Sequence, residues 1–523
     1  MEATERPAIG AAAWRHASAT QAALVVDAAD YFSAARRGML QARRRIMLIG
    51  WDFDARIRLA DPAKRLAGEP RALGDFILWL VDRTPELEVF LLRWNIGALR
   101  TLFRGTTLLT LVRWMAHPRI HARLDAASTP GAAHHHKIVV IDDRLAFCGG
   151  IDMTSNRWDT PAHLDDDPRR TMPNGVPYGP WHDSTMALQG PAAAALGELS
   201  RERWHEAGGK PLAPIPPLAP GSGETAPWPD GLAPHFRGVS VAISRSRPAT
   251  SEESAIVEVE ETFLAEIAAA RRYIFAESQY FASRRIAEAM ADRLAEADGP
   301  EIVLINPERA HGWLEPIAMD TARARLVSVM RHADGHRRFR LYHPVTAAGR
   351  PIYVHAKVLI VDDRVLHVGS SNMNNRSLRL DTECDITIDA ALTDNASDAD
   401  AIRETIAGLR DRLLGEHLGL APDSVRARIE AEGSLIAAIE ALRGDGRSLR
   451  PYQVPVLNEV ETWLADNELL DPEGPEEIFK PLSQRGLLRR LRHRFRRPRR
   501  TLHPQRQSSR TKAAWLDPET PAG

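Results

Sequence analysis

The sequence predicts an α/β protein with two pseudo-symmetric βα lobes, each a mixed sheet flanked by helices, followed by a C-terminal helical segment and a basic tail. Three observations support this fold class. Short runs of Ile, Val and Leu bounded by turn residues alternate with segments of helical period, which is typical of βα units on a buried sheet. The whole pattern occurs twice in the same order. A stretch rich in Pro and Gly separates the two copies.

The repeat is clearest in two stretches that carry the same residue types at one constant offset. GAAHHHKIVVIDDRLAFCGGID spans residues 131–152, and YVHAKVLIVDDRVLHVGSSN spans residues 353–372. Both contain the pattern HxKxxxxD followed by two small residues, which indicates an internal duplication. Its members are His135, Lys137, Asp142, Gly149 and Gly150 in the first copy, and His355, Lys357, Asp362, Gly369 and Ser370 in the second.

The elements before each motif also recur. In the first copy, the expected strands RRRIMLIGWDFD (43–54) and PELEVFLLRW (85–94) enclose the helical segment DFILWLVDRT. In the second copy, ARRYIFAESQYF (270–281) and PEIVLINPE (300–308) enclose IAEAMADRLAEA. We therefore expect a first lobe at 1–206, a Pro/Gly-rich linker or surface crossover at 207–238, a second lobe at 239–425, a helical segment at 426–480 and a basic tail at 481–523.

Charge is distributed unevenly along the 523 residues. The formal net charge is only −1, but residues 485–512 hold twelve Arg or Lys and no acid, so the rest of the chain is acidic. Only this tail suits a polyanion or an anionic membrane. Within it, GLLRRLRHRF places Leu487, Leu488, Leu491 and Phe495 on one helical face, as in a helix that lies on a membrane surface. A disordered basic tail without a specific partner accounts for the composition equally well.

Cysteine use and hydropathy bear on the cellular compartment. Cys148 and Cys384 each lie in an apolar stretch, so we expect buried free thiols and no disulfide framework. The N-terminus has no unbroken apolar core of a signal peptide, and no window approaches the roughly 18 apolar residues of a spanning helix. We expect a cytoplasmic or peripheral membrane protein, with export that uses no cleaved signal as an alternative. Because both motifs lie on one chain, we expect a monomer.

The repeated motif has the residue types that phosphoryl transfer needs. His135 and Lys137 are two residues apart at the start of an expected strand, so their side chains share a face, whereas Asp142 points to the other face and serves the core or an ion pair. Two copies bring two imidazoles and two lysines together. Lysines can neutralise phosphate oxygens while one imidazole attacks phosphorus and the other protonates the leaving oxygen. The near symmetry of the copies leaves the order of the two histidines open.

A metal site at the histidine triplet is not expected. Neighbouring strand positions point to opposite faces, so His134, His135 and His136 cannot all ligate one ion. The two lysines already supply the positive charge that a divalent cation would bring to a phosphate. The sequence therefore predicts neither a metal nor another cofactor for this chemistry.

These motifs resemble the phospholipase D superfamily, whose signature is the duplicated HxKxxxxD followed by GG or GS. The resemblance covers roughly residues 20 to 420. DTPAHL at 159–164, PWHD at 180–183 and AESQYF at 276–281 are similar to segments of phospholipases D proper. Two departures stand out, because Asp152 and Ser278 occupy positions where many members have Asn.

The resemblance implies an enzyme that hydrolyses glycerophospholipids such as phosphatidylcholine to phosphatidic acid through a phosphohistidine, with transfer of the phosphatidyl group to alcohols. It makes His135 the nucleophile and His355 the general acid and then base. Carboxylates from the opposite halves are implied to orient them, Glu383 for His135 and Asp183 for His355. Asn372 is implied to donate to a phosphate oxygen. Candidates for the substrate channel are Asp152, Trp51, Trp94, Trp158, Trp181 and Tyr280.

Other functions fit parts of the same pattern. A phosphatidyltransferase resembling cardiolipin synthase uses the same motifs, and so does a nuclease of the superfamily, which the basic tail would serve. The acidic body argues against a long nucleic-acid track, so we expect no nucleic-acid partner. A catalytically inactive scaffold is disfavoured by two intact motifs. The expected partners are a glycerophospholipid and a membrane surface, contacted by residues 485–512.

Overall fold

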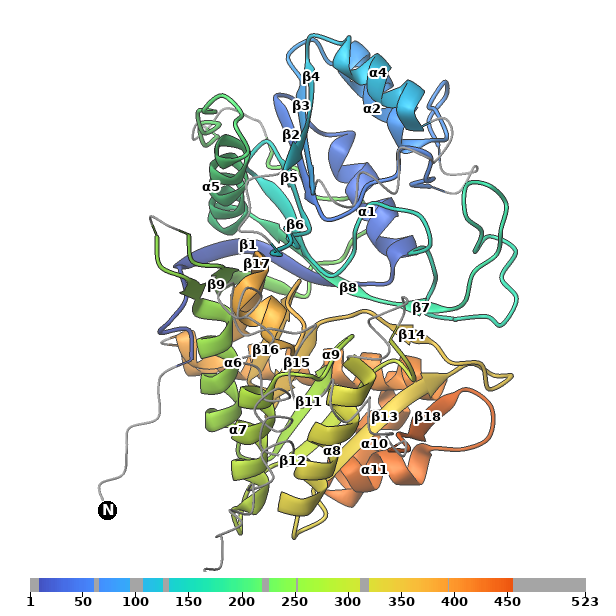
Figure 1. Cartoon of the computed structure of the whole chain (residues 1–523), viewed down its shortest axis with the longest axis vertical. Coiled ribbons are helices and arrows are strands. Elements are labelled where there is room, and N and C mark those ends of the chain that lie inside the picture. Colours follow the sequence, from blue (N-terminus) through green and yellow to red (C-terminus); the bar gives the residue numbers. More distant parts are fainter. Residues whose placement is uncertain are drawn as a thin grey trace, which may run out of the picture. The chain divides into compact units, whose positions relative to one another are not determined.

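The computed structural model describes residues 9–60, 65–94, 107–125, 131–218, 225–250, 253–310, 319–393 and 395–454. Within these ranges the strands form one mixed sheet of 16 strands and a separate pair of strands. Helices lie against both faces of the large sheet (Figure 1). The fold is therefore of the predicted α/β class, but the two lobes share one continuous sheet.

The first lobe contains three parallel strands and four antiparallel ones. Parallel order is set by the crossover helices, and the buried apolar faces of the strands explain their Ile, Val and Leu content. The parallel strands are β2 (Arg45–Gly50), β3 (Glu88–Trp94) and β4 (Ile120–Asp125), joined through α2 (Leu73–Arg83) and α4 (Thr107–Met115). The antiparallel strands are β5 (Ile138–Ile141), β6 (Leu145–Gly149), β8 (Ser184–Gln189) and β1 (Arg15–Val26), and α1 (Ala28–Met39) and α5 (Pro191–Glu206) pack on the lobe.

The second lobe repeats this order with its own residues. Its parallel strands are β11 (Tyr273–Glu277), β12 (Glu301–Ile305) and β13 (Phe339–Val345), joined through α7 (Arg284–Ala295) and α8 (Thr321–Ala333). Its antiparallel strands are β15 (Val358–Val361), β16 (Val365–Gly369), β17 (Glu383–Asp389) and β9 (Phe236–Arg247), with β10 (Ile256–Val257) beside β9 and α6 (Glu258–Ala269) after it. Two short helices, η3 (Arg376–Leu380) and η4 (Ala390–Leu392), flank β17.

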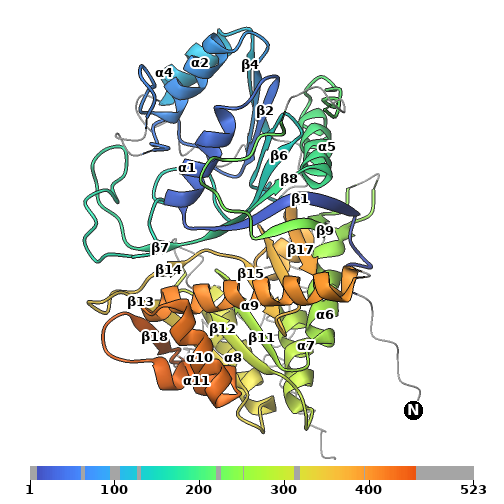
Figure 2. The same cartoon turned by 180° about the vertical axis from the view of Figure 1, so that it is seen from behind.

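The C-terminal described segment completes the second lobe. Helix α9 (Ala396–Leu418) begins at Asn395, whose side chain accepts the Ser397 N–H, and runs across one face of the strands (Figure 2). It is followed by α10 (Pro422–Glu432), α11 (Leu435–Leu442) and β18 (Ser448–Pro451), which pairs with β13. The expected boundary at residue 425 thus falls inside α10, because these helices pack on the same sheet. The basic tail at 481–523 lies outside the described residues.

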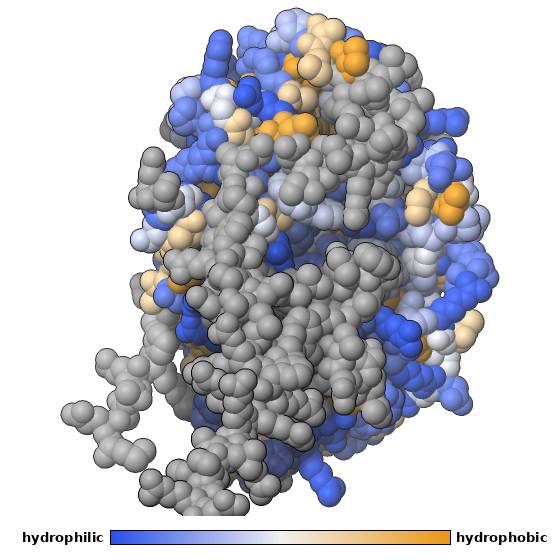
Figure 3. All heavy atoms as spheres, in the orientation of Figure 1, coloured by the Kyte–Doolittle hydropathy of each residue, from blue (hydrophilic) through white to orange (hydrophobic). Residues whose placement is uncertain are grey.

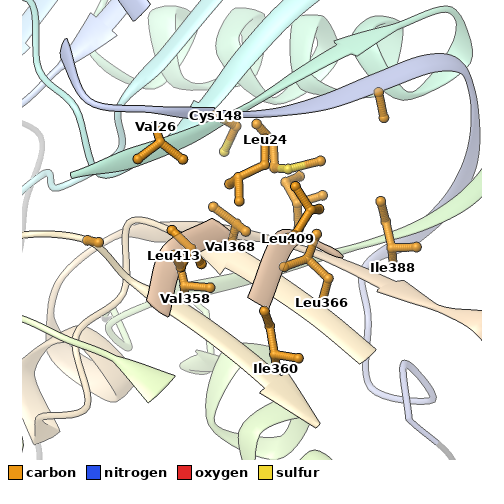
Figure 4. Close-up of a cluster of buried hydrophobic side chains, with 14 of the residues drawn as sticks. Leu24, Val26, Cys148, Val358, Ile360, Leu366, Val368, Ile388, Leu409 and Leu413 are labelled. Atoms are coloured by element: carbon orange, nitrogen blue, oxygen red, sulfur yellow. The ribbon is translucent and has the colours of Figure 1, made fainter. Parts of the chain in front are cut away.

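The two lobes are joined by backbone pairing and by a shared apolar core. Strand β1 pairs with β8 of its own lobe and with β9, and β9 pairs with β17. Leu24 and Val26 of β1 face Val358 and Val368 of the second lobe across this core (Figure 4). Burial of this apolar surface favours one fixed arrangement of the lobes.

Two further features bear on function. A two-stranded parallel sheet, β7 (Trp181–His182) with β14 (Tyr353–Val354), links a loop of the first lobe to the second motif. Cys148 and Cys384 are buried free thiols, as the sequence predicts. Among the helices of the described ranges, none combines the length and apolarity needed to cross a membrane.

Candidate active site

The His and Lys of each motif lie in extended chain just before a strand. Strands β5 and β15 begin at Ile138 and Val358, one residue after each lysine, and not at the histidines as the motif pattern predicts. In both copies the lysine ammonium turns back to donate to the carbonyl of the histidine two residues before it; Lys137 Nζ lies 2.9 Å from the His135 oxygen, and Lys357 makes the same contact with His355. Each motif therefore presents an imidazole and an ammonium group together.

The first histidine is held by the second lobe. The His135 backbone N–H donates to the Thr382 carbonyl at 3.0 Å, and Nδ1 lies 2.9 Å from Oε1 of Glu383, the first residue of β17. Ser370 Oγ donates to the other oxygen of Glu383 at 2.6 Å. With Nδ1–H directed to a carboxylate, the neutral ring carries its lone pair on Nε2.

The second histidine is held by the first lobe in the corresponding way. The His355 N–H donates to the His182 carbonyl at 2.8 Å, and Nδ1 lies 2.7 Å from Oδ2 of Asp183. A Cβ added at Gly150 would overlap Oδ1 of Asp183, so only glycine allows this approach. Both carboxylate pairings that the resemblance implies are thus made, each across the two halves.

The two lysines have different neighbours. Lys137 Nζ lies 3.4 Å from Oδ2 of Asp152, a buried ion pair. Lys357 Nζ lies 3.5 Å from Oε1 of Gln279, and Asn372 Nδ2 is 3.4 Å from the same oxygen. The side-chain contact of the second lysine is therefore an amide oxygen, whereas that of the first lysine is a carboxylate.

Burial shapes the electrostatics of the site. It lowers the pKa of His135 well below its usual value, and the charges of Lys137 and Lys357 lower it further. It lowers the pKa of His355 in the same way, helped by Lys357 and Arg157. Burial lowers the pKa of Lys357 to about 7, against the attraction of Asp183. Both imidazoles are therefore neutral in the empty site at pH 7.

Burial also acts on the two orienting carboxyl groups. Burial raises the pKa of Glu383 well above its usual value, although the charge of Lys137 opposes this shift. Burial also raises the pKa of Asp183, and here the charge of Lys357 opposes the shift. Isolated charges are costly in this setting. A phosphodiester anion placed between the lysines would favour the cationic form of His355, because opposite charges stabilise each other.

The aspartates that end the motifs are structural. Asp142 accepts the backbone N–H groups of Arg43, Arg44 and Arg45, at 2.7 and 2.8 Å for the first two. Asp362 accepts those of residues 271–273 in the same manner. Both aspartates adopt positive φ, 53° and 56°, in the turn that closes each hairpin. Each motif aspartate thus fixes the start of the neighbouring strand to the motif hairpin.

Asp152 has a structural role beside its contact with Lys137. Its Oδ1 accepts the backbone N–H of Trp51 at 3.1 Å and lies 3.3 Å from the N–H of Asp52. The carboxylate therefore connects the end of β2 to the first motif lysine. Asn372, the matching residue of the second half, lies beside Gln279 instead.

The small residues that follow the motifs make room for carboxylates. A Cβ at Gly369 would overlap Asp385, and one at Gly149 would overlap the backbone of Thr185. Asp385 lies in β17, the strand that begins at Glu383. Thr185 lies in β8, the strand that begins directly after Asp183. Gly369 and Gly149 therefore allow β17 and β8 to pack closely against the motif strands.

Aromatic side chains border both imidazoles. The Trp51 ring meets His135 edge-on with centroids 6.3 Å apart and stacks on Trp94 at 6.0 Å. Trp181 lies 5.2 Å from His355 and stacks on Tyr353 at 4.6 Å. Two other candidates make different contacts: Tyr280 Oη accepts from Gln279 Nε2 at 3.0 Å, and the Trp158 ring lies 4.9 Å under Arg169.

Two residues of the site were not predicted as site residues from the sequence. Gln279 contacts Lys357, Asn372 and Tyr353, and it stands inside the AESQYF segment that the resemblance already singled out. Arg157 lies over the Trp181 ring at 4.3 Å, just before DTPAHL. The available signal was position inside AESQYF for Gln279 and position two residues before DTPAHL for Arg157.

Comparisons with known proteins agree with this geometry. Residues 38–215 match the family described as phospholipase D, and residues 263–404 match the family described as cardiolipin synthase, PLD-like domain. The chain belongs to the phospholipase D superfamily.

Its relatives include proteins with several names. Phospholipase D1 of Schizosaccharomyces pombe is 24% identical over 77% of this chain and 36% of its own length. Phospholipase D alpha 1 of Carica papaya is 24% identical over 56% of this chain and 49% of its own length. Cardiolipin synthase A of Pseudomonas entomophila is 29% identical over 55% of this chain and 52% of its own length. The chain thus spans about a third to a half of the length of these relatives.

The fold is also found among solved structures. The phosphatidylserine synthase of Haemophilus influenzae Rd KW20 superposes with a TM-score of 0.51 and 12% identity, over 75% of this chain and 88% of that one. At this identity the likeness concerns the arrangement of the lobes alone.

Proposed function

We propose that the chain is a phospholipase D-type phosphodiesterase that cleaves the distal phosphate ester of a glycerophospholipid such as phosphatidylcholine, gives phosphatidic acid and transfers the phosphatidyl group to small alcohols. One observation carries the proposal: two neutral imidazoles, each held by a carboxylate of the opposite half, accompany two buried lysines. The relatives named phospholipase D support the substrate class.

In the first step His135 Nε2 attacks phosphorus, a P–N bond forms, and the bond from phosphorus to the headgroup oxygen breaks. His355, which is cationic once the phosphodiester is bound, gives its Nε2 proton to that oxygen and becomes neutral. In the second step neutral His355 takes a proton from water or an alcohol, whose oxygen attacks phosphorus and displaces His135. Lys137, Lys357 and Asn372 stabilise the charge on the phosphate oxygens.

The order of the two histidines rests on the family resemblance and agrees with their exposure. The His135 side chain is 17% exposed and that of His355 is 6% exposed. A nucleophile has to reach phosphorus directly, whereas a proton donor needs only the edge of the leaving group. We therefore assign the more accessible ring to the attack.

Binding to an anionic membrane surface belongs to the same proposal. The basic residues 485–512 supply charge, and Val112, Met115 and Leu124 expose apolar side chains on and beside α4. Figure 3 shows orange, apolar atoms at the end of the molecule where α4 lies in Figure 1. Truncation after Gly486 should weaken binding to anionic vesicles by about 1 kcal/mol for each arginine near the surface. Turnover of a soluble short-chain lipid should stay unchanged. Unaltered vesicle binding would exclude a role of the tail.

A phosphatidyltransferase that resembles cardiolipin synthase is the second candidate. The match of residues 263–404 to the family of that name favours it, and so does the relative from Pseudomonas entomophila. The covalent intermediate would be the same, and only the acceptor alcohol would differ.

One assay separates these functions. The protein is incubated with mixed phospholipids, including phosphatidylglycerol, in the presence and absence of ethanol, and the lipid products are identified by mass spectrometry. Phosphatidylethanol beside phosphatidic acid supports the phospholipase, and cardiolipin without phosphatidic acid supports the transferase. Robust cleavage of DNA with no change in any lipid would overturn both.

A further inference from the structure

A second buried polar group lies between the lobes, behind His355. Its members are Asp27, at the end of β1, His163 of the loop that follows the first motif, His182 of β7 and Glu416 of α9. Their side chains are 0%, 0%, 0% and 3% exposed. We call these four residues the interlobe cluster. The proposed phosphodiesterase reaction assigns no role to it.

The donor atoms of the interlobe cluster converge on one point. Glu416 Oε1 lies 2.7 Å from His182 Nδ1 and 3.1 Å from His163 Nε2. Asp27 lies 3.4 Å from His182 Nδ1 through Oδ1 and 3.6 Å from His163 Nε2 through Oδ2. Ligands of a tetrahedral zinc ion, with bonds of roughly 2.0 to 2.1 Å, are about 3.3 Å apart. The observed separations lie on both sides of this value.

The far nitrogen of each cluster histidine is already bonded to a carboxylate. His163 Nδ1 donates to Asp159 Oδ2 at 3.0 Å, and His182 Nε2 donates to Glu277 Oε2 at 2.8 Å. Metal-bound histidines almost always donate their second N–H to a carboxylate, a carbonyl or water. This arrangement fixes both rings with one nitrogen directed at the shared centre.

The carboxylates are held as well. Arg170 Nη1 donates to both oxygens of Asp159 at 3.1 Å, and the His417 ring lies 2.8 Å from Glu277 Oε1. The surroundings of the cluster are therefore fixed by partners from both lobes.

Two oxygens of the interlobe cluster lack a hydrogen-bond donor. They are Oδ2 of Asp27 and Oε2 of Glu416, both buried. A buried carboxylate oxygen without a donor is costly, and most buried polar atoms have a partner. This is a second observation, separate from the convergence of the ligands, and a bound cation would account for it.

We propose that the interlobe cluster binds one divalent transition-metal ion of the zinc type through two imidazole nitrogens and two carboxylate oxygens. Nitrogen and oxygen donors of this kind suit such ions. The His182 carbonyl accepts the N–H of His355 at 2.8 Å, and Asp27 Oδ1 accepts the N–H of Asp183 at 3.2 Å. The ion is structural: it ties α9 to the first lobe and fixes the base of the His355–Asp183 pair without contacting the phosphate.

Metal content of the full-length protein gives the first test. After expression with added zinc and purification without chelators, elemental analysis should find about one ion per chain. His163→Gln removes a ligand and should reduce this to below about a tenth. The matched control is His367→Gln. His367 is also buried between two carboxylates, with Nδ1 3.0 Å from Glu266 and Nε2 2.9 Å from Asp385. Because these carboxylates contact opposite ring nitrogens, they share no centre at which an ion could bind. The control should retain the full metal content.

Cobalt provides a spectroscopic test, whose first part uses the wild-type protein alone. Wild-type protein loaded with Co²⁺ should show the intense visible absorption of a tetrahedral site. In His163→Cys the thiolate replaces the imidazole, and a sulfur-to-cobalt charge-transfer band should appear in the near ultraviolet.

Two results would contradict the proposed metal site. Wild-type protein that binds neither Zn²⁺ nor Co²⁺ would overturn the proposal and leave the cluster as a network of ion pairs. Equal metal content in wild type and His163→Gln would also overturn it. Lipid turnover is no readout in these experiments, so a failure of the proposed function would leave their outcome unaffected.

Discussion

The two half-sites share one plan and differ in how they treat charge. In the first half Lys137 is paired with a carboxylate, Asp152, which also holds the end of β2. In the second half Lys357 contacts the amide oxygen of Gln279, which also accepts from Asn372. The first lysine is therefore balanced by a carboxylate at contact distance, whereas Lys357, whose pKa burial lowers to about 7, gains its full charge when a phosphate anion binds beside it. We infer from this difference that the second half provides most of the attraction for the phosphate.

A difference of the same kind occurs deeper in the lobes. Phe147 of β6 is buried among apolar side chains, whereas the corresponding residue of β16, His367, lies between two carboxylates and stacks on Phe263 at 4.5 Å. The duplicated halves have thus diverged in polarity while keeping the same strand order. The following experiments test what this divergence means.

Replacement of the two histidines should give the largest effects. His135→Ala removes the nucleophile, so no covalent adduct should form with any substrate. His355→Ala removes the proton donor and should slow cleavage of a poor leaving group by about 10²- to 10⁴-fold. With a nitrophenyl leaving group the first step should survive in His355→Ala, and the adduct should accumulate on His135. Intact-mass measurement after rapid quenching would detect it. An adduct mapped to His355 in His135→Ala would reverse the two roles.

Loss of Lys357 should have the next largest effect. Lys357→Met removes a buried positive charge beside the phosphate and should lower kcat/KM by about 10²- to 10³-fold. Lys137→Met should cost less, because Lys137 already shares its charge with Asp152. Steady-state kinetics of the two variants on one lipid substrate would measure the difference. An equal loss in both would contradict the proposed division of charge between the halves.

The pH dependence of anion binding sharpens the same comparison. Burial lowers the pKa of Lys357 to about 7, with Asp183, Lys137, Glu383 and Arg157 as the charged groups around it. The ammonium form is therefore lost as pH rises through about 7, and sulfate binding should weaken above this pH. Lys357→Arg keeps its charge and should lose this dependence. Calorimetric titration with sulfate between pH 6 and 9 would measure both proteins, and identical profiles would refute the assignment.

Exchange of the matching residues Asp152 and Asn372 should affect stability more than chemistry. Asp152→Asn leaves the Lys137 ammonium buried without its carboxylate, which should cost roughly 3 kcal/mol of unfolding free energy. Asn372→Asp instead adds a negative charge next to Gln279, the residue that contacts Lys357, so it should weaken sulfate binding with little loss of stability. Urea unfolding and the same calorimetry would test both variants. Unchanged stability of Asp152→Asn would mean that the ion pair contributes little.

The last comparison concerns the stability contributed by His367. Burial opposes its charge, but Glu266 and Asp385 raise the pKa of His367 to about 10 in the folded protein. Because this lies above the value of an unfolded histidine, about 6.5, the stabilisation is complete below pH 6.5 and is lost as pH rises towards 10. His367→Gln should remove this decline from the unfolding free energy measured across that range. A slope that persists in the variant would have another origin.

The sequence by itself determined the duplication, the order of strands and helices, and the pairing of a histidine with a lysine in each motif. These features depend on residues close together in the chain, where the period of apolar residues and the spacing of two side chains decide the local geometry. The contacts of Glu383 with His135 and of Asp183 with His355 were expected from the family resemblance alone. No local sequence pattern predicted them.

Only the tertiary structure decided how the two halves meet. The pairing of β1 with β9 joins the lobes into one sheet, and β18 adds a strand to a segment expected to be helical. The same packing places Gln279 beside Lys357 and gathers His163, His182 and Glu416 from distant parts of the chain. No sequence spacing specifies such contacts, because they depend on which faces of the sheet and of α9 are buried together.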